Sequence, residues 1–230
     1  MLRGVRAQAR RTFDGALFER DLRLWALRPA ARAFADVRDW PGVEAIDRAL
    51  SARAGVRFVP AERRPRRQRG PVDLDKLYDA HIVRGEVPTR ANDWHDLLNA
   101  LVWATFPRAK AALHARQHRA VQAWARTHAM MLDAHTVAKL PNARTRELDA
   151  LALLDEGGVL LVGDRSILFG HAHYEGIALG VPAMIGRAVR LDVPDEDDPE
   201  RLVMAADAEF VRRLSEPLVP EDLPRASTAW

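Results

Sequence analysis

The chain has 230 residues, of which 48% are hydrophobic and 29% are charged, and its formal net charge is +3. This composition is typical of a globular protein with a sizeable core. The absence of cysteine excludes disulfides, thiolate nucleophiles and Cys-ligated metals, and it fits a cytoplasmic location. No apolar run reaches the roughly 18 residues that cross a bilayer, and none follows the basic N-terminus. We therefore expect no membrane span, no signal peptide and no membrane partner.

Positive charge is concentrated at the start of the chain. Residues 1–70 contain 17 Arg and 8 acidic residues, a net charge of +9, whereas residues 71–230 have a net charge of −6. The segment ERRPRRQRG at 62–70 could contact phosphates, so nucleic acid is one candidate partner. However, no aromatic residue is interleaved with these arginines, and single-strand binders usually supply such stacking surfaces. Only three of the 35 basic residues are Lys, which is more typical of GC-rich coding, and a solvated surface is the preferred interpretation.

Hydrophobic periodicity predicts mostly helices and a few strands. Helices are expected at 15–27, 43–54, 73–80, 93–105, 106–126, 171–179 and 198–214, and strands at 56–60 and 187–193. Two apolar runs in 150–163, separated by Asp155-Glu156-Gly157-Gly158, predict a β-hairpin. The expected fold class is α+β, a mostly helical single domain with a central helix pair and a small antiparallel or mixed sheet. Its expected parts are a basic N-terminal helical segment (1–55), a main α+β domain (56–215) and a C-terminal tail (216–230).

The segment TRANDWHDLLNALVWATFP at 89–107 begins the central helix pair. Asp93 is a natural N-cap, and the helical period places the apolar side chains on one face. The opposite face combines four side chains that differ in character, His95, Asp96, Asn99 and Trp103. A large aromatic is rarely left fully in water, so the polar stripe is expected to be covered by protein or by a ligand.

The second helix of the pair brings further candidates to the same region. Lys110 and His114 are four residues apart, so they share one edge of that helix. The tight Phe-Pro corner between the helices could place them around one concavity with the polar stripe. The candidate catalytic residues are therefore His95, Asp96, Asn99, Lys110 and His114. Arg90 and Trp103 are the candidate substrate-binding residues, because Arg90 could hold an anionic group bidentately.

A second candidate constellation lies in FGHAHYEG at 169–176. If this segment is helical, His171 and Glu175 share a face and His173 points away; if it is extended, all three side chains point the same way. Two His and a carboxylate form a familiar set of ligands for zinc or iron. His171 and Glu175 are therefore the candidate metal ligands for a divalent ion, with structural histidines as the alternative. Asp155 and Glu156 could also supply a general base or a metal carboxylate, although a charged turn before Gly-Gly is the preferred interpretation.

Four segments in fixed order resemble one known family. They are YDAHI, GEVPTRANDWHDLLNALVWATFPRAKAALHARQH, LLDEGGVLLV and FGHAHYE, and the resemblance covers about residues 56–195. The chain resembles the bacterial family called domain of unknown function 3025. This resemblance implies an uncharacterised bacterial protein and supplies no activity or catalytic residue to transfer. It also implies a single His in the Gly-His segment, so that His173 is a local variation beside His171 and Glu175.

Two classes of function remain open from the sequence. The first is a hydrolase-like enzyme, metal-dependent or not, with its polar site on the helix pair at 93–118. The alternative is a non-enzymatic binding or regulatory module, whose polar cluster is structural and whose basic half contacts nucleic acid. A Walker A loop, a dinucleotide-binding fingerprint, a Gly-x-Ser-x-Gly elbow and a His-Glu-x-x-His motif are all absent from the sequence. Substrate, cofactor and oligomeric state are not predicted.

Overall fold

The computed structural model describes residues 12–62, 75, 77–129 and 145–227. Most of the predicted arginine-rich loop at 62–70 therefore lies outside the described residues. Within the described ranges, no helix is long and apolar enough to cross a membrane.

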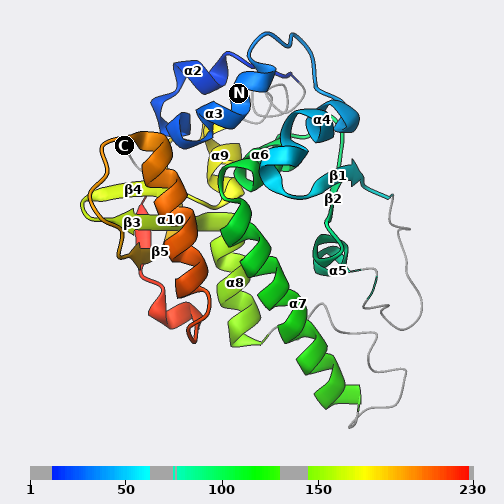
Figure 1. Cartoon of the computed structure of the whole chain (residues 1–230), viewed down its shortest axis with the longest axis vertical. Coiled ribbons are helices and arrows are strands. Elements are labelled where there is room, and N and C mark those ends of the chain that lie inside the picture. Colours follow the sequence, from blue (N-terminus) through cyan, green and yellow to red (C-terminus); the bar gives the residue numbers. More distant parts are fainter. Residues whose placement is uncertain (1–11, 63–74, 76, 130–144, 228–230) are drawn as a thin grey trace.

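A central helix pair organises the fold, as the sequence predicted (Figure 1). The first helix, α6 (Trp94–Thr105), begins at Asp93, whose side chain accepts a hydrogen bond from the Asp96 backbone N–H. Every residue of α6 is buried except His95 and Asp96, so this helix runs through the core and opens only at its N-terminal end. The second helix, α7 (Pro107–Ala129), follows after the Phe106 corner. It packs against two helices from later in the chain, α8 (Arg146–Gly157) and α10 (Pro199–Arg213).

The helix α8 corrects the sequence interpretation of residues 150–163. The apolar run before Gly157-Gly158 is the second half of a helix that starts at its cap residue Thr145, and it is not a strand. The hairpin begins one step later, between β3 (Gly158–Val162) and β4 (Arg165–Leu168), and it turns at Gly163, where φ is +57°. Asp155 and Glu156 consequently lie in the last turn of a helix rather than in a hairpin turn.

The main sheet is mixed, with the strand order β4-β3-β5-β6. Strand β3 is antiparallel to β4 and parallel to β5 (Ile185–Leu191), which pairs antiparallel with β6 (Arg225–Ser227). The short helix α9 (His171–Ala178) follows β4 directly and packs on α6 and α8. This arrangement brings the start of α6, the end of α8 and the start of α9 to one place (Figure 1).

The N-terminal third of the described chain covers α6 from the other side. Helix α4 (Val43–Ala54) packs on α6 and ends at Gly55, a left-handed C-cap with φ of +70°. A separate parallel pair joins β1 (Arg57–Pro60) to β2 (Glu86–Thr89). One hydrophobic core draws side chains from all these parts. The remaining helical segments are α2 (Leu17–Arg20), η1 (Leu22–Leu27), α3 (Arg28–Ala31), η2 (Arg32–Phe34), α5 (Tyr78–Val83) and η5 (Pro220–Asp222).

Candidate metal centre

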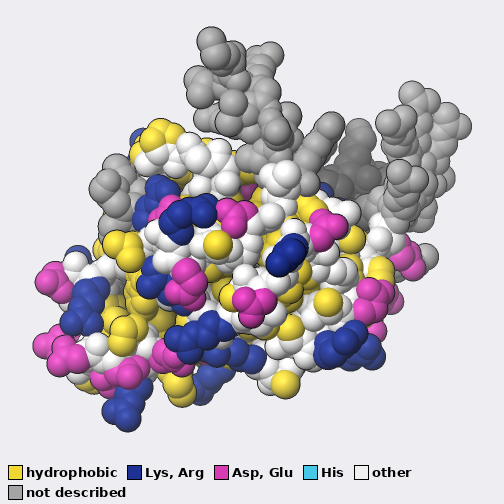
Figure 2. Space-filling view, turned by 90° about the horizontal axis from the view of Figure 1, so that it is seen from above, with side chains coloured by type: hydrophobic (Ala, Val, Ile, Leu, Met, Phe, Trp, Pro, Cys, Tyr) yellow, Lys and Arg dark blue, Asp and Glu magenta, His cyan; other side chains and the backbone are white. Residues whose placement is uncertain are grey.

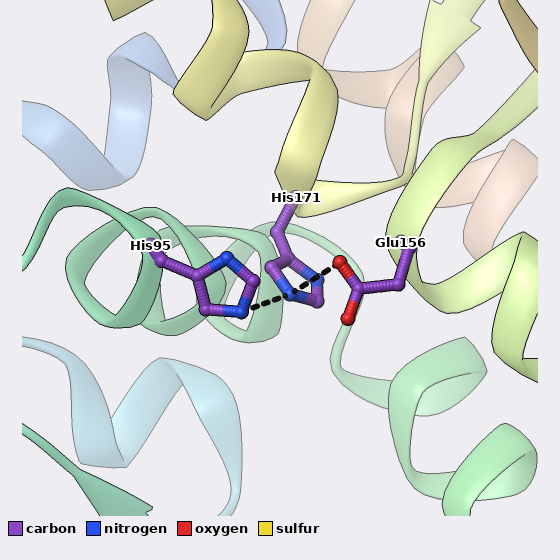
Figure 3. A group of neighbouring side chains, drawn as sticks. All are labelled: His95, Glu156 and His171. Atoms are coloured by element: carbon purple, nitrogen blue, oxygen red, sulfur yellow. Dashed lines mark hydrogen bonds and ion pairs between the residues drawn. The ribbon is translucent and has the colours of Figure 1, made fainter.

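Three side chains from three helices meet where α6 opens to solvent. His95 is in the first turn of α6, Glu156 is in the last turn of α8 and His171 begins α9, and all three point toward one another (Figure 3). One ligand atom from each lies within 4.8 Å of the others. The Nε2 atoms of His95 and His171 are 3.0 Å apart, and the Nε2 atom of His171 is 3.5 Å from Glu156 Oε2. Two imidazole nitrogens and one carboxylate oxygen form a donor set for a divalent ion.

The geometry of the facing imidazoles indicates which coordination the group could supply to an ion. With the ring proton of each histidine on Nδ1, the two Nε2 lone pairs face each other and need a proton or a cation between them. With metal–nitrogen bonds of about 2.0–2.1 Å, a 3.0 Å separation of the two Nε2 atoms corresponds to an angle of about 90° at the metal. The two histidines are therefore spaced for adjacent positions of a metal coordination sphere. The Glu156 side chain is half exposed and could supply the third ligand. Coordination positions toward solvent would then remain open.

A fourth residue, Glu175, fixes the ring of His95. Its Oε2 atom lies 3.0 Å from His95 Nδ1. Because a carboxylate accepts, the Nδ1 atom donates and the Nε2 lone pair of His95 is directed at His171. This hydrogen bond is also the main cause that raises the pKa of His95. Glu175 therefore orients one candidate ligand, while Glu156 is the carboxylate that could reach an ion held by the two histidines.

Burial sets the protonation of the other two residues. It lowers the pKa of His171 to about 3, so this imidazole is neutral near pH 7, and its lone pair faces His95 when the ring proton is on Nδ1. Partial burial, together with the neighbouring Asp155 carboxylate, raises the pKa of Glu156. A bound cation would offset this effect, because opposite charge favours the ionised carboxylate.

A buried charged network lies behind the metal centre. Lys110 is fully buried, and its Nζ atom donates to Asn99 Oδ1 at 2.8 Å and to Asp155 Oδ1 at 2.5 Å. The Asn99 amide in turn donates to the Tyr78 hydroxyl at 2.9 Å. Burial alone would raise the pKa of Asp155, but Lys110 and His114 outweigh it and hold that pKa below its usual range. Asp155 directly precedes Glu156, so the network is anchored to the same turn of α8.

The predicted site residues separate into three groups. His95, His171 and Glu175 meet at the metal centre, whereas Asn99 and Lys110 lie in the buried network. His114 is also buried, with Nδ1 2.9 Å from Asp79 and Nε2 3.6 Å from Asp155.

The third group consists of candidate residues whose predicted roles are not supported by a contact with His95, Glu156 or His171: Arg90 and Asp96 contact each other, and Trp103 contacts His114. The Asp96 carboxylate receives two hydrogen bonds from the Arg90 guanidinium, which also contacts Asp93. Trp103 has no exposed surface and stacks on the His114 ring at a centroid distance of 5.5 Å. Protein therefore covers the polar stripe at Trp103, and the proposed roles of Arg90 and Trp103 in binding substrate stay predictions.

Glu156 is the candidate ligand that sequence reasoning passed over. Its carboxylate was a candidate, but the Gly-Gly that follows it was interpreted as a hairpin turn. A helical period in ALALLDE, with Leu151 and Leu154 buried on one face, was the signal that could have placed Glu156 at a helix end.

Comparison with known proteins supports the family and little more. Residues 56–168 match the family described as "Protein of unknown function (DUF3025)". No curated protein matches the chain. Crystal structures of phenylalanine hydroxylase from Chromobacterium violaceum are similar at 15% identity for a mutant form and 14% for a form with bound Fe(III). Each alignment covers 98% of this chain and 86% of that chain, with a TM-score of 0.43, and a likeness this distant supports no assignment.

Proposed function

The chain belongs to the DUF3025 family, whose function is unknown, and we propose that it is a divalent-metal-dependent enzyme of the hydrolase class. The observation that carries this proposal is the convergence of His95, His171 and Glu156 from three separate helices. His95 is 61 positions before Glu156, and Glu156 is 15 positions before His171, so only the tertiary fold brings them together. Three protein ligands leave coordination positions for water and substrate, as in catalytic metal sites.

The hydrolase class follows from the chemistry that such a metal site supports. A bound divalent ion lowers the pKa of a coordinated water and polarises the bond to be cleaved. In hydrolysis the water's hydroxyl adds to the electrophilic atom and its proton leaves with the departing group, so no oxidant is required. The chain's own part is to orient His95 through Glu175, to keep His171 neutral by burial, and to shield one side of the site with the α6 core.

The spacing of the histidines favours a second candidate function. An angle of about 90° between two nitrogen ligands suits a six-coordinate ion better than tetrahedral zinc. Two His and one carboxylate with open positions also hold Fe(II) in enzymes that activate oxygen. Oxygen consumption by the Fe(II)-loaded protein, measured with an oxygen electrode, distinguishes this candidate from hydrolysis.

The alternative of a nucleic-acid-binding module has less support. On the face drawn in Figure 2, basic and acidic side chains of the described residues alternate and form no patch of one sign. Binding through phosphates requires such a patch and weakens steeply with salt. Filter binding of RNA and DNA at low and high salt tests this alternative.

The hydrolase proposal is tested with chelator-treated protein. We expect cleavage of a chromogenic ester or phosphoester after reloading with Zn²⁺ or Mn²⁺, and loss of that activity in Glu156→Gln. His118→Gln is the matched control, because His118 is on α7 and its Nε2 atom lies 2.9 Å from the Gln122 side-chain amide, outside the three residues of the proposed metal centre. If neither reloaded form cleaves any member of a panel of ester, phosphoester and amide substrates, the hydrolase class is wrong.

A further inference from the structure

The backbone around Glu156 and His171 forms one junction. Glu156 precedes Gly157-Gly158 at the end of α8, and His171 follows Gly170 at the start of α9. The Gly158 carbonyl accepts hydrogen bonds from the backbone N–H groups of both Phe169 and Gly170, each at 2.9 Å. The two chain segments that carry these ligands are therefore joined directly by their main chains.

Gly170 makes this close approach possible. Its φ of −67° is ordinary for any residue, so its role does not depend on backbone conformation. A Cβ atom at this position would lie 2.4 Å from the Glu156 carbonyl oxygen and 2.4 Å from the Gly158 nitrogen. Both atoms belong to the main chain and cannot rotate away. Any larger residue at position 170 would force α9 away from the end of α8.

His173 also contacts this junction. Its Nε2 atom lies 3.0 Å from the Gly157 carbonyl oxygen, and its ring is buried. Since a carbonyl only accepts, Nε2 carries the proton and donates. This contact fixes the peptide between Gly157 and Gly158, directly after Glu156, and it gives a role to a histidine that the sequence marked as a local variation.

We propose that Gly170 and His173 are positioning residues that set the gap between the metal ligands Glu156 and His171. The proposal rests on the proposed metal centre for its function, but the positioning itself is a property of the metal-free chain. A change at either residue is expected to alter the metal centre before it alters the fold.

The metal arm of the test compares Gly170→Ala with Gly15→Ala. The control introduces the same kind of clash, since a Cβ at Gly15 would lie 2.4 Å from the Phe34 carbonyl oxygen, in the N-terminal segment. With Co²⁺ as the probe, we expect at least a tenfold weaker affinity and altered visible absorption bands in Gly170→Ala. Gly15→Ala is expected to keep the wild-type bands and affinity, although both variants melt earlier.

A metal-free arm separates this inference from the proposed function. The chain has no cysteine, so Glu156→Cys with His171→Cys creates a single thiol pair. Dibromobimane becomes fluorescent when it bridges two thiols, and we expect efficient bridging in this background and with Gly15→Ala. Adding Gly170→Ala is expected to reduce bridging severalfold. If wild-type protein binds no Co²⁺, the proposed function fails and the bimane arm alone decides the inference.

Two results would overturn the inference. The first is that Gly170→Ala shows the same dibromobimane bridging and the same Co²⁺ affinity as Gly15→Ala. If Gly170→Ala does not fold by circular dichroism, His173→Leu takes its place, because it removes the hydrogen bond to Gly157 and keeps an apolar side chain of similar size in the buried position. Bridging and Co²⁺ affinity unchanged from wild type in His173→Leu would then overturn the positioning role.

Discussion

Lys110 lies in surroundings that are unusual for a lysine, because lysine side chains are rarely fully buried. Its ammonium group is fully buried between the carboxylate of Asp155 and the amide of Asn99, 5.6 Å from the centre of the Trp103 ring. The sequence predicted that Lys110 lies near the polar stripe of α6, and the contact with Asn99 places it there. It could not predict Asp155 as the partner, because 45 residues separate the two along the chain.

The Lys110–Asp155 pair leads to a prediction on stability. Lys110→Met leaves a nearly buried carboxylate without its counter-ion, and we expect the free energy of unfolding to fall by about 3–5 kcal/mol. The double variant Lys110→Met/Asp155→Leu removes both charges and is expected to recover most of this loss. Urea unfolding followed by tryptophan fluorescence measures both. A double variant that is less stable than the single variant would contradict the prediction.

The helices and strands were predicted well where a local signal marks their ends. Helix α4 has its left-handed glycine and α6 has its aspartate cap, and both occur where the sequence placed them. The sequence failed at α8 and the hairpin, where a Gly-Gly pair follows an apolar run. This pattern is compatible locally with a helix end and with a hairpin turn. The packing of α8 on α7 and α9 decides between them. The convergence of Glu156 with His95 and His171 depends on this same packing, so no local pattern could show it.

The N-cap of α10, the last long helix, leads to a prediction on stability. The Asp198 side chain accepts a hydrogen bond from the Arg201 backbone N–H at 2.9 Å and caps α10. Asp198→Ala leaves that N–H without its protein partner, and we expect about 1 kcal/mol less stability in thermal unfolding. Asp198→Asn keeps an accepting oxygen and serves as the control. Equal melting temperatures for wild type and Asp198→Ala would show that the cap contributes nothing.

The molecule as a whole is built around α6, which is buried along nearly its full length. The N-terminal segment covers one side of this helix, and α7 and α9 cover others. Its two open residues, His95 and Asp96, lie at the end where we propose the metal centre. A core helix that exposes only its first turn can hold a ligand rigidly and still leave it accessible to solvent.

The two tyrosines report on the integrity of this core. The chain contains only two, and burial raises the pKa of both the Tyr78 and the Tyr174 hydroxyls above the ordinary value. A raised pKa favours the protonated hydroxyl in the folded state. The resulting stability is complete below about pH 10, the value of the unfolded chain, and is lost as the pH rises above it.

We therefore expect tyrosinate absorbance to appear only together with alkaline unfolding. Ultraviolet difference spectra and tryptophan fluorescence, recorded on the same samples from about pH 8 to 13, measure the two events. Tyrosine ionisation near pH 10 in a protein that keeps its native fluorescence would contradict the burial of these hydroxyls.

The central claim is that His95, His171 and Glu156 bind one divalent ion, and titration calorimetry with elemental analysis tests it most directly. The wild-type protein, stripped and then titrated with Zn²⁺, Mn²⁺ or Fe²⁺, is expected to bind about one equivalent of at least one ion. His95→Ala, His171→Ala and Glu156→Gln are expected to lose that binding, and Glu175→Gln to weaken it roughly 10- to 100-fold. His118→Gln should bind like wild type. A wild-type protein that binds none of these ions, or binding that survives in all three ligand variants, would contradict the claim.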